Sequence, residues 1–222
     1  MFLLVDKDKG ITSHDVVNKI RKITGEKRVG HAGTLDPNAS GLLIVAVGRD
    51  STKDLWKKYG NLKKTYIAEI TLGEERETDD AEGNFIYKSD NTKVFKKEDI
   101  VKVLNGFVGE KMQMPPLYSA IKIKGKKAYD LARRGINLSL SPRKVHIYSI
   151  KLIKYHHPLL EIEVIVSSGT YVRALARDIG KKLGCGAYLS NLRRTKIGKF
   201  KVENSIEVNK LNRVNIKNCV LS

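Results

Sequence analysis

The stretch GHAGTLDPNASGLLIVAVG, residues 30–48, combines a histidine, an aspartate before a proline, four glycines and an apolar run. Residues 42–47 predict a buried β-strand, because the run is short, apolar and rich in branched side chains. Asp36 stands five residues after His31, in the turn that enters this strand. A loop carboxylate on a rigid scaffold is a typical place for a catalytic group, and Asp before Pro is equally a common turn starter. From the residues alone, both interpretations of Asp36 stay open.

The rest of the chain predicts an α+β protein with a largely antiparallel sheet, since strand-like and helix-like runs follow one another without a regular βαβ order. Strands are expected at 2–5, 42–47 and 64–73, and a hairpin pair at 146–155 and 159–167. Helices are expected at 13–24 with Ser13 as N-cap, at 51–60 with Ser51 and Asp54 as a capping box, at 96–109 and at 169–184. Residues 119–135 predict a strand turning into a helix, and 74–84 predict a solvated or structural acidic loop.

Composition excludes several classes of protein. The 222 residues are 41% hydrophobic, and no apolar run reaches the eighteen or so residues that a membrane helix needs. The apolar start is too short for a signal-peptide core, so a cytoplasmic location is expected. Cys185 and Cys219 lack metal-ligand spacing and are interpreted as buried or idle thiols.

Positive charge is concentrated in two segments. The formal net charge is +18, yet residues 1–109 hold 19 basic and 17 acidic side chains, nearly in balance. Most of the excess lies in 110–160 and 181–222. Such concentration favours a polyanionic partner, most commonly nucleic acid. An acidic membrane face is the weaker alternative, because no basic amphipathic helix with an aromatic face is present.

From the residues alone, the chain is interpreted as a basic, nucleic-acid-binding protein with one notable aspartate, Asp36. There is no glycosidase-like carboxylate pair, no legible Ser-His-Asp order, no Walker loop and no dinucleotide fingerprint. Taken singly, Tyr66 is typical of a core tyrosine and Arg173 of a charge on a helix surface.

Six blocks of sequence nevertheless resemble one family in order. Residues 30–48 resemble the catalytic motif of the TruB family of tRNA pseudouridine synthases. The resemblance extends over most of residues 3–198, through KDKGITSHDVVNKIRK, KTYIAEITLG with the following TDDAEG, MPPLYSAIKIKGKKAYDLARRG, SSGTYVRALARDIGKKLG and LRRTKIG. It implies the pseudouridine synthase fold, a central mixed sheet flanked by helices.

The resemblance also implies a reaction. Uridine 55 in the T loop of tRNA would lose its bond between N1 and C1′, turn, and be rejoined through C5. Because both bonds centre on one carbon, a single carboxylate serves and neither a cofactor nor a metal is expected. By position, Asp36 would be the essential aspartate, whether it adds to sugar or base or assists a glycal intermediate. Arg173 would pair with Asp36, and Tyr66 would stack on the base near C5.

Further positions acquire expected roles from the same resemblance. Leu192 and Tyr171 would line the base pocket, and His31 would contact or replace the extruded nucleotide. Lys9 and Gly10 belong to a first motif that supports the catalytic loop, although Asp8 stands where the family usually has proline. The RNA-gripping insertion would contact phosphates through Lys122, Lys124, Lys126, Lys127, Arg133 and Arg134.

The expected organisation is one catalytic domain over 1–222 with an insertion around 110–140 and without a full C-terminal PUA-like domain. The expected partner is the T arm of tRNA, bound by a monomer that needs no protein partner. Two alternatives remain: a guide-RNA-dependent enzyme of the dyskerin type, and a module that binds and folds tRNA without chemistry.

Overall fold

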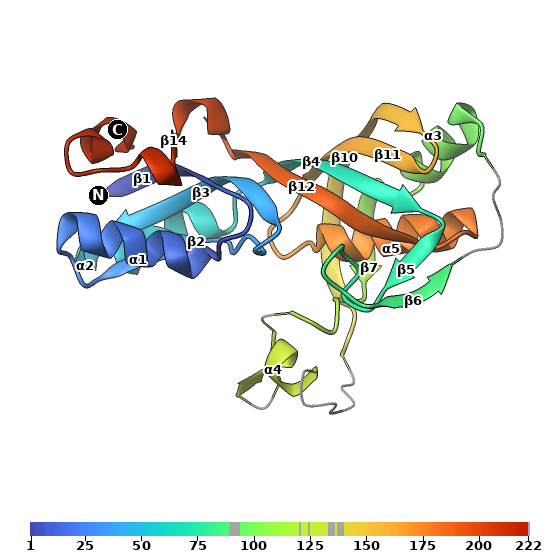
Figure 1. Cartoon of the computed structure of the whole chain (residues 1–222), viewed down its shortest axis with the longest axis horizontal. Helices are drawn as coiled ribbons and strands as arrows, with labels where there is room; N and C mark the ends of the chain where they lie inside the picture. The colour runs from blue at the N-terminus through green and yellow to red at the C-terminus, as the bar shows by residue number, and fades with distance from the viewer. Residues whose placement is uncertain (89–93, 120, 124, 133–135, 137–139, 222) are drawn as a thin grey trace. The chain divides into compact units, whose positions relative to one another are not determined.

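The computed structural model describes residues 1–88, 94–119, 121–123, 125–132, 136 and 140–221. Its contacts divide the chain into two units (Figure 1). Unit 1 comprises residues 1–67 and 192–222, the blue start and red end of the chain, and unit 2 comprises 68–191. The boundaries fall inside two strands, β4 (Lys64–Leu72) and β12 (Ala187–Ile197).

Unit 1 contains a mixed sheet in which β14, β1, β3 and β12 follow one another. Its strands are β1 (Phe2–Lys7), β2 (Val29–Ala32), β3 (Ala39–Val47), β13 (Phe200–Lys201) and β14 (Ile206–Glu207), with the start of β4 and the end of β12. The β1–β3, β2–β3 and β12–β13 pairs are antiparallel, whereas β1–β14 and β3–β12 are parallel.

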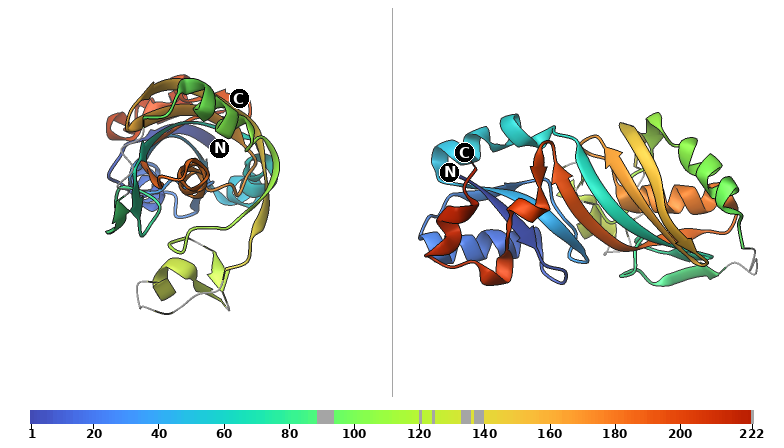
Figure 2. Two further views of the ribbon diagram at one scale, coloured as in Figure 1. Left: turned by 90° about the vertical axis from the view of Figure 1, so that its right-hand side faces the viewer. Right: turned by 90° about the horizontal axis from the view of Figure 1, so that it is seen from above.

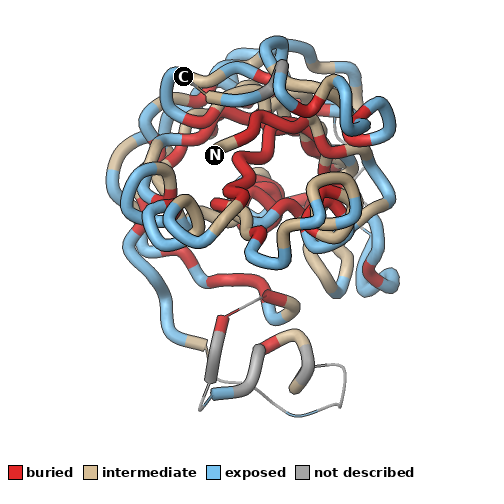
Figure 3. Tube along the Cα trace, turned by 90° about the vertical axis from the view of Figure 1, so that its left-hand side faces the viewer, coloured by how far each residue is buried: buried red, intermediate tan, exposed pale blue. Residues whose placement is uncertain are grey.

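The apolar run of β3 is buried on both faces. Leu43 and Val45 pack in one cluster with Val16 and Ile20 of helix α1 (Ser13–Thr24). The alternate residues of β3 pack in a second cluster with Leu55 of helix α2 (Arg49–Leu55). A strand covered on both sides loses the usual polar alternation, which explains why this stretch is almost wholly apolar. Figure 3 shows the buried residues of the chain in red, with exposed segments around them.

Gly41 allows β3 and β12 to lie against each other. It pairs in register with Arg194 and has a φ of 109°. A Cβ at Gly41 would lie 2.3 Å from the carbonyl oxygen of Arg194. The clash is with backbone atoms of Arg194, which cannot rotate away as a side chain could. Glycine is therefore required here both for conformation and for space.

Replacing Gly41 with alanine is expected to lower the free energy of unfolding by about 3 kcal/mol, the sum of strain and overpacking. Gly25→Ala is the matched control. Gly25 also has a positive φ, of 73°, but nothing lies within 4 Å of an added Cβ. Urea denaturation of both variants measures the difference. Equal losses of stability in the two variants would mean that the clash between the added Cβ and the Arg194 backbone costs nothing.

The helix starts of unit 1 differ from the sequence prediction. Helix α1 begins one residue earlier than expected, with Thr12 as its N-cap in a capping box with Asp15, because the Ser13 hydroxyl bonds to the Leu35 backbone instead. The predicted capping box of Ser51 and Asp54 is wrong. Helix α2 follows Gly48 without a side-chain cap and passes into a π-turn, η1 (Trp56–Gly60). Three 3₁₀ turns close the chain: η2 (Val202–Asn204), η3 (Val208–Lys210) and η4 (Asn215–Cys219).

Unit 2 contains strands in the order β12, β4, β11, β10 and β7. The predicted hairpin is confirmed as the antiparallel pair β10–β11, which run side by side in Figures 1 and 2. The strands are β5 (Glu74–Arg76), β6 (Phe85–Lys88), β7 (Gly109–Gln113), β10 (Arg143–His156) and β11 (Leu159–Val166). The predicted helices are confirmed as α3 (Lys97–Asn105) and α5 (Val172–Leu183), with Gly184 ending α5. Helix α3 ends earlier than expected, because Gly106 caps it and Gly109 already belongs to β7.

The insertion was expected around residues 110–140, but residues 110–113 belong to β7, and a small hairpin follows later in this range. Strands β8 (Lys122–Ile123) and β9 (Lys126–Lys127) pair in register and lead into helix α4 (Ala128–Ala132). Lys122 therefore stands opposite Lys127 on the hairpin backbone. The predicted phosphate contacts Lys124, Arg133 and Arg134 lie outside the described residues. Among the described helices, none is long and apolar enough to cross a membrane.

Candidate active site

Asp36 lies half-buried in the loop between β2 and β3. Its carbonyl oxygen accepts a hydrogen bond from the Ala39 backbone at 3.0 Å, which closes the turn at the start of β3. Gly33, at the other end of the loop, has a φ of 82°. The loop therefore leaves one strand, presents the carboxylate and enters the next within a few residues.

The buried side chain of Lys7 supports the Asp36 loop. Lys7, at the end of β1, is fully buried and its Nζ donates to the carbonyls of Asp8 at 2.8 Å, Ile11 at 2.6 Å and Pro37 at 3.3 Å. Burial lowers the pKa of Lys7 to about 8, and the negative charge of Asp36 opposes that shift. The ammonium thus joins the first motif to the residue that follows Asp36.

Two further contacts join the first motif to the loop. The backbone N–H of Gly10 donates to the Pro37 carbonyl at 2.9 Å. The Ser13 hydroxyl bonds both to the Leu35 N–H and to the Leu35 carbonyl, at 2.9 and 3.0 Å. Lys9 itself is exposed. The residues immediately before and after Asp36 are therefore anchored to the start of α1 and to the segment that precedes it.

Arg194 is a buried cation that the sequence analysis did not single out. Its side chain is almost fully buried and donates to the carbonyls of Leu42 at 2.7 Å and Gly33 at 3.0 Å. It also reaches the Tyr66 hydroxyl at 3.4 Å, with the guanidinium 5.9 Å from the ring centroid. Arg194 thus joins the Asp36 loop to Tyr66, which is buried on β4.

The remaining predicted residues of unit 1 lie on strands beside the loop. Leu192 is buried on β12 and pairs in register with Ala39, three residues after Asp36. His31 lies on β2, and burial lowers the pKa of its imidazole, as does the charge of Arg194. Its Nδ1 is buried without a hydrogen-bond partner among the described residues. Burial and the charge of Arg194 both favour the neutral form of the His31 imidazole.

Arg173 lies in unit 2, on the first turn of α5, and is buried rather than on the helix surface. Its guanidinium donates to the carbonyls of Thr78 at 3.0 Å and Tyr118 at 3.1 Å, and lies 3.3 Å from the Asp80 carboxylate. The acidic loop 74–84 was predicted to be either solvated or structural, and Asp80 in it has a structural role as the partner of Arg173. These contacts fix the plane of the guanidinium.

Tyr171 is the N-cap of α5, and Gln113 of β7 pairs with its backbone. The Tyr171 N–H donates to Oε1 of Gln113 at 2.9 Å, and Nε2 of Gln113 donates to the Tyr171 carbonyl at 3.0 Å. A buried amide that satisfies both backbone groups of one residue fixes the start of the helix.

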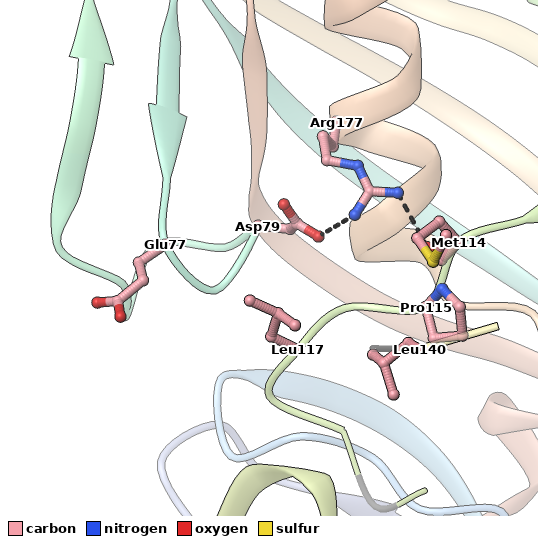
Figure 4. A pocket seen from close by; sticks show the side chains of 7 residues that line it. All are labelled: Glu77, Asp79, Met114, Pro115, Leu117, Leu140 and Arg177. Carbon is pink, nitrogen blue, oxygen red and sulfur yellow. Dashed lines mark hydrogen bonds and ion pairs between the residues drawn. The ribbon is translucent and has the colours of Figure 1, made fainter. Parts of the chain in front are cut away.

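A cavity of about 370 Å³ lies beside α5 in unit 2 (Figure 4). Arg177, one turn after Arg173, donates to Asp79 at 2.8 Å and to the Met114 carbonyl at 2.9 Å. The lining residues are Glu77, Asp79, Met114, Pro115, Leu117, Leu140 and Arg177. Among the described residues, no cluster of three or more His, Cys, Asp or Glu side chains could hold a metal ion.

The stability that Asp79 contributes is expected to fall as pH rises. Burial raises the pKa of Asp79 to about 6, although Arg177 and Arg173 oppose the shift. Between about pH 4 and pH 6 the folded state then holds a proton that the unfolded state has lost, so ionisation in the folded state costs stability. Urea unfolding should show Asp79→Asn gaining roughly 1–3 kcal/mol on the wild type over this range. A difference independent of pH would contradict this.

Two family models match successive parts of this chain. A family model described as TruB family pseudouridylate synthase (N terminal domain) matches residues 21–172. The model of the tRNA pseudouridylate synthase B C-terminal domain matches residues 173–219. The chain belongs to the TruB family. Asp36, His31 and Tyr66 fall in the first matched region, and Arg173 and Leu192 in the second.

Curated relatives in the TruB family cover most of the chain. The tRNA pseudouridine synthase B of Clostridium tetani is 45% identical over 98% of this chain and 74% of its own length. That of Dehalococcoides mccartyi (strain CBDB1) is 46% identical over 92% of this chain and 67% of its own length.

Solved structures confirm the predicted fold. A Cbf5-Nop10-Gar1 complex contains a chain 32% identical to this one with a TM-score of 0.73, matched over 95% of this chain and 53% of that one. A structure of an H/ACA RNP bound to a substrate RNA gives 29% identity and a TM-score of 0.69, over 95% of this chain and 51% of that one. This TruB-family chain thus spans about half the length of those proteins.

Proposed function

We propose that this protein converts uridine 55 of tRNA to pseudouridine. The observation that carries the proposal is the Asp36 loop: the chain of a TruB-family protein presents one carboxylate between two strands, with its flanking residues held by Lys7, Gly10 and Ser13. Curated relatives about 45% identical to it are named tRNA pseudouridine synthase B.

The proposed reaction is an isomerisation within one nucleotide. The bond between N1 and C1′ breaks, the base turns, C5 bonds to C1′, and the proton on C5 leaves while N1 gains one. Atoms and electrons balance without a redox partner. Asp36 is the group that acts on the sugar or the base during this exchange. A carboxylate on an anchored loop suits this role, because its position is set before the substrate binds.

The other residues keep the roles that the family resemblance implies. Arg173 pairs with Asp36, and its guanidinium is prepared for this by fixed contacts in unit 2. Tyr66 stacks on the flipped base and lies near C5, and Arg194 orients its ring. Leu192 and Tyr171 line the base pocket, His31 contacts the extruded nucleotide, Lys9 and Gly10 support the loop, and Lys122, Lys126, Arg133 and Arg134 contact phosphates.

The proposed partner is the T arm of tRNA, bound in the cytoplasm by a monomer without a protein partner. A guide-RNA-dependent activity is less favoured. The solved neighbours, from a Cbf5-Nop10-Gar1 complex and from H/ACA particles, are 27–32% identical to this chain, whereas the curated relatives named for tRNA reach 43–48%. A module that only binds tRNA has no use for an anchored carboxylate.

Incubation of the pure protein with an unmodified tRNA transcript tests the proposal. Pseudouridine at position 55 in the absence of any guide RNA is the expected product. No product without guide RNA, and product once a guide is added, would support the guide-dependent alternative. Binding without product under either condition would support the tRNA-binding module.

Affinity for tRNA is expected to fall steeply with salt. Each phosphate neutralised releases counterions, so the binding constant should lose roughly 0.9 log units per log unit of salt for each contact on duplex, and about 0.7 on single strands. The basic segments 110–160 and 181–222 offer several such contacts. Filter binding between low and physiological salt measures the slope. A flat dependence would show that the net charge takes no part in binding.

A further inference from the structure

Trp56 is the single tryptophan of the chain, and it is 60% exposed. It opens the π-turn η1, directly after α2 in unit 1. An exposed indole is unusual where nothing apolar covers it, because a ring of this size contributes more to stability when buried. Packing in the core therefore does not explain why a tryptophan stands at this position.

The indole packs with one face against the backbone of its own turn. A Cβ on Gly60 would lie 2.6 Å from Cδ2 of Trp56 and 2.9 Å from both Cε2 and Cε3. These atoms belong to the fused ring, so the Gly60 backbone supports one face of the indole. Gly60 is buried, and its carbonyl accepts a hydrogen bond from Lys64 at 3.0 Å. The Gly60 backbone therefore covers one face of the indole, and the exposed area of Trp56 belongs mainly to the other face.

The segment that contains this turn and a neighbouring segment of unit 1 are both rich in lysine. The Gly198 N–H donates to the Lys63 carbonyl at 2.8 Å, and the rings of Tyr59 and Phe200 lie 5.7 Å apart, so 53–63 and 196–201 are neighbours. Lys58 is held 3.3 Å from Asp54 and 5.3 Å from the Phe2 ring. The two segments contain one acid, Asp54, and these basic residues: Lys53, Lys57, Lys58, Lys63, Lys196, Lys199 and Lys201.

We propose that Trp56, with Lys57, Lys58, Lys199 and Lys201, forms a second RNA-binding surface, called here the Trp56 surface. It takes an unpaired nucleotide whose base stacks on the free face of the indole and whose flanking phosphates meet the lysines. Aromatic platforms within basic grooves bind single-stranded nucleic acid in this way. The inference rests on the proposed function, since it takes the tRNA substrate as the source of that nucleotide.

Charge distinguishes this surface from another exposed aromatic pair. Phe85 and Tyr87 of β6 are 55% and 49% exposed. They follow the acidic loop 74–84, and Tyr87 pairs in register with Glu75 of β5. Phosphates would be repelled there. Phe85 therefore serves as a control, an exposed aromatic residue in surroundings of the opposite charge.

Fluorescence tests the Trp56 surface directly, because emission comes from this one tryptophan. Titration with an unmodified tRNA transcript should quench the emission saturably and protect the indole from iodide, in step with filter binding. The same should hold for Asp36→Asn, which separates binding from turnover. Unchanged emission and iodide access at saturating tRNA would overturn the inference while leaving the proposed function intact. Conversely, quenching without pseudouridine formation by the wild type would overturn the proposed function alone.

Substitution gives a second measurement. Trp56→Ala should weaken tRNA binding by about 5- to 150-fold, the range that loss of one stacked base produces. Trp56→Phe keeps an aromatic face and should bind within a few-fold of the wild type. Phe85→Ala should leave the affinity unchanged. Wild-type affinity in Trp56→Ala, or an equal loss in Phe85→Ala, would contradict the inference.

Discussion

Replacing Asp36 with asparagine is expected to abolish turnover while leaving the affinity for tRNA within a few-fold of the wild type. The amide keeps the size of the side chain but can neither form the required bond nor accept the proton. A fall of at least about 10⁴ in the single-turnover rate is expected, equivalent to about 5.4 kcal/mol of transition-state stabilisation. Binding should persist, because it rests on phosphates and on the shape of the RNA.

Single-turnover assays and filter binding measure the two effects separately. Asp50→Asn, an exposed carboxylate on α2 in the same unit, is the control and should keep the wild-type rate. Thermal unfolding shows whether Asp36→Asn is folded. A rate for Asp36→Asn within tenfold of the wild type would remove Asp36 from the chemistry.

The second large effect is expected for Arg173→Lys. The positive charge is retained, but a lysine cannot reproduce the planar fork that contacts Thr78, Asp80 and Tyr118. If Arg173 aims Asp36, the single-turnover rate should fall about a thousandfold, or about 4.1 kcal/mol. The affinity for tRNA should change far less than the rate.

Arg177→Lys is the matched control for this variant. Arg177 lies one turn further along α5 and is likewise paired with an acid of the same loop, Asp79. Loss of its fork disturbs a similar ion pair without touching Arg173. Equal losses of rate in the two variants would show that Arg173 acts only by stabilising unit 2.

The strands were predictable where apolar pattern alone determines them. The run in β3 is buried on both faces, and in the predicted strand over 64–73 the alternation places Tyr66, Ala68, Ile70 and Leu72 on the buried side of β4. Helix starts were less predictable. Thr12 and Ser13 are both good N-caps, and the choice depends on Leu35, which is distant in sequence and engages the Ser13 hydroxyl.

The supporting residues of the candidate site could not be predicted from local sequence. Lys7 and Arg194 are charged residues in strands, where the ordinary expectation is a solvated side chain. Their burial depends on carbonyl groups brought together only by the fold, at Pro37 and Gly33. In the same way, Arg173 alone is typical of a helix surface, and its burial depends on the acidic loop before β6.

Release of tritium from C5 tests the central claim most directly. Formation of the bond from C5 to C1′ expels the proton on C5, so a tRNA transcript made with [5-³H]uridine records each completed reaction. The account predicts that the wild type releases the tritium of one uridine per tRNA, without guide RNA, and releases none from a transcript with cytidine at position 55. Release from that altered transcript, or no release from the natural one, would contradict the account.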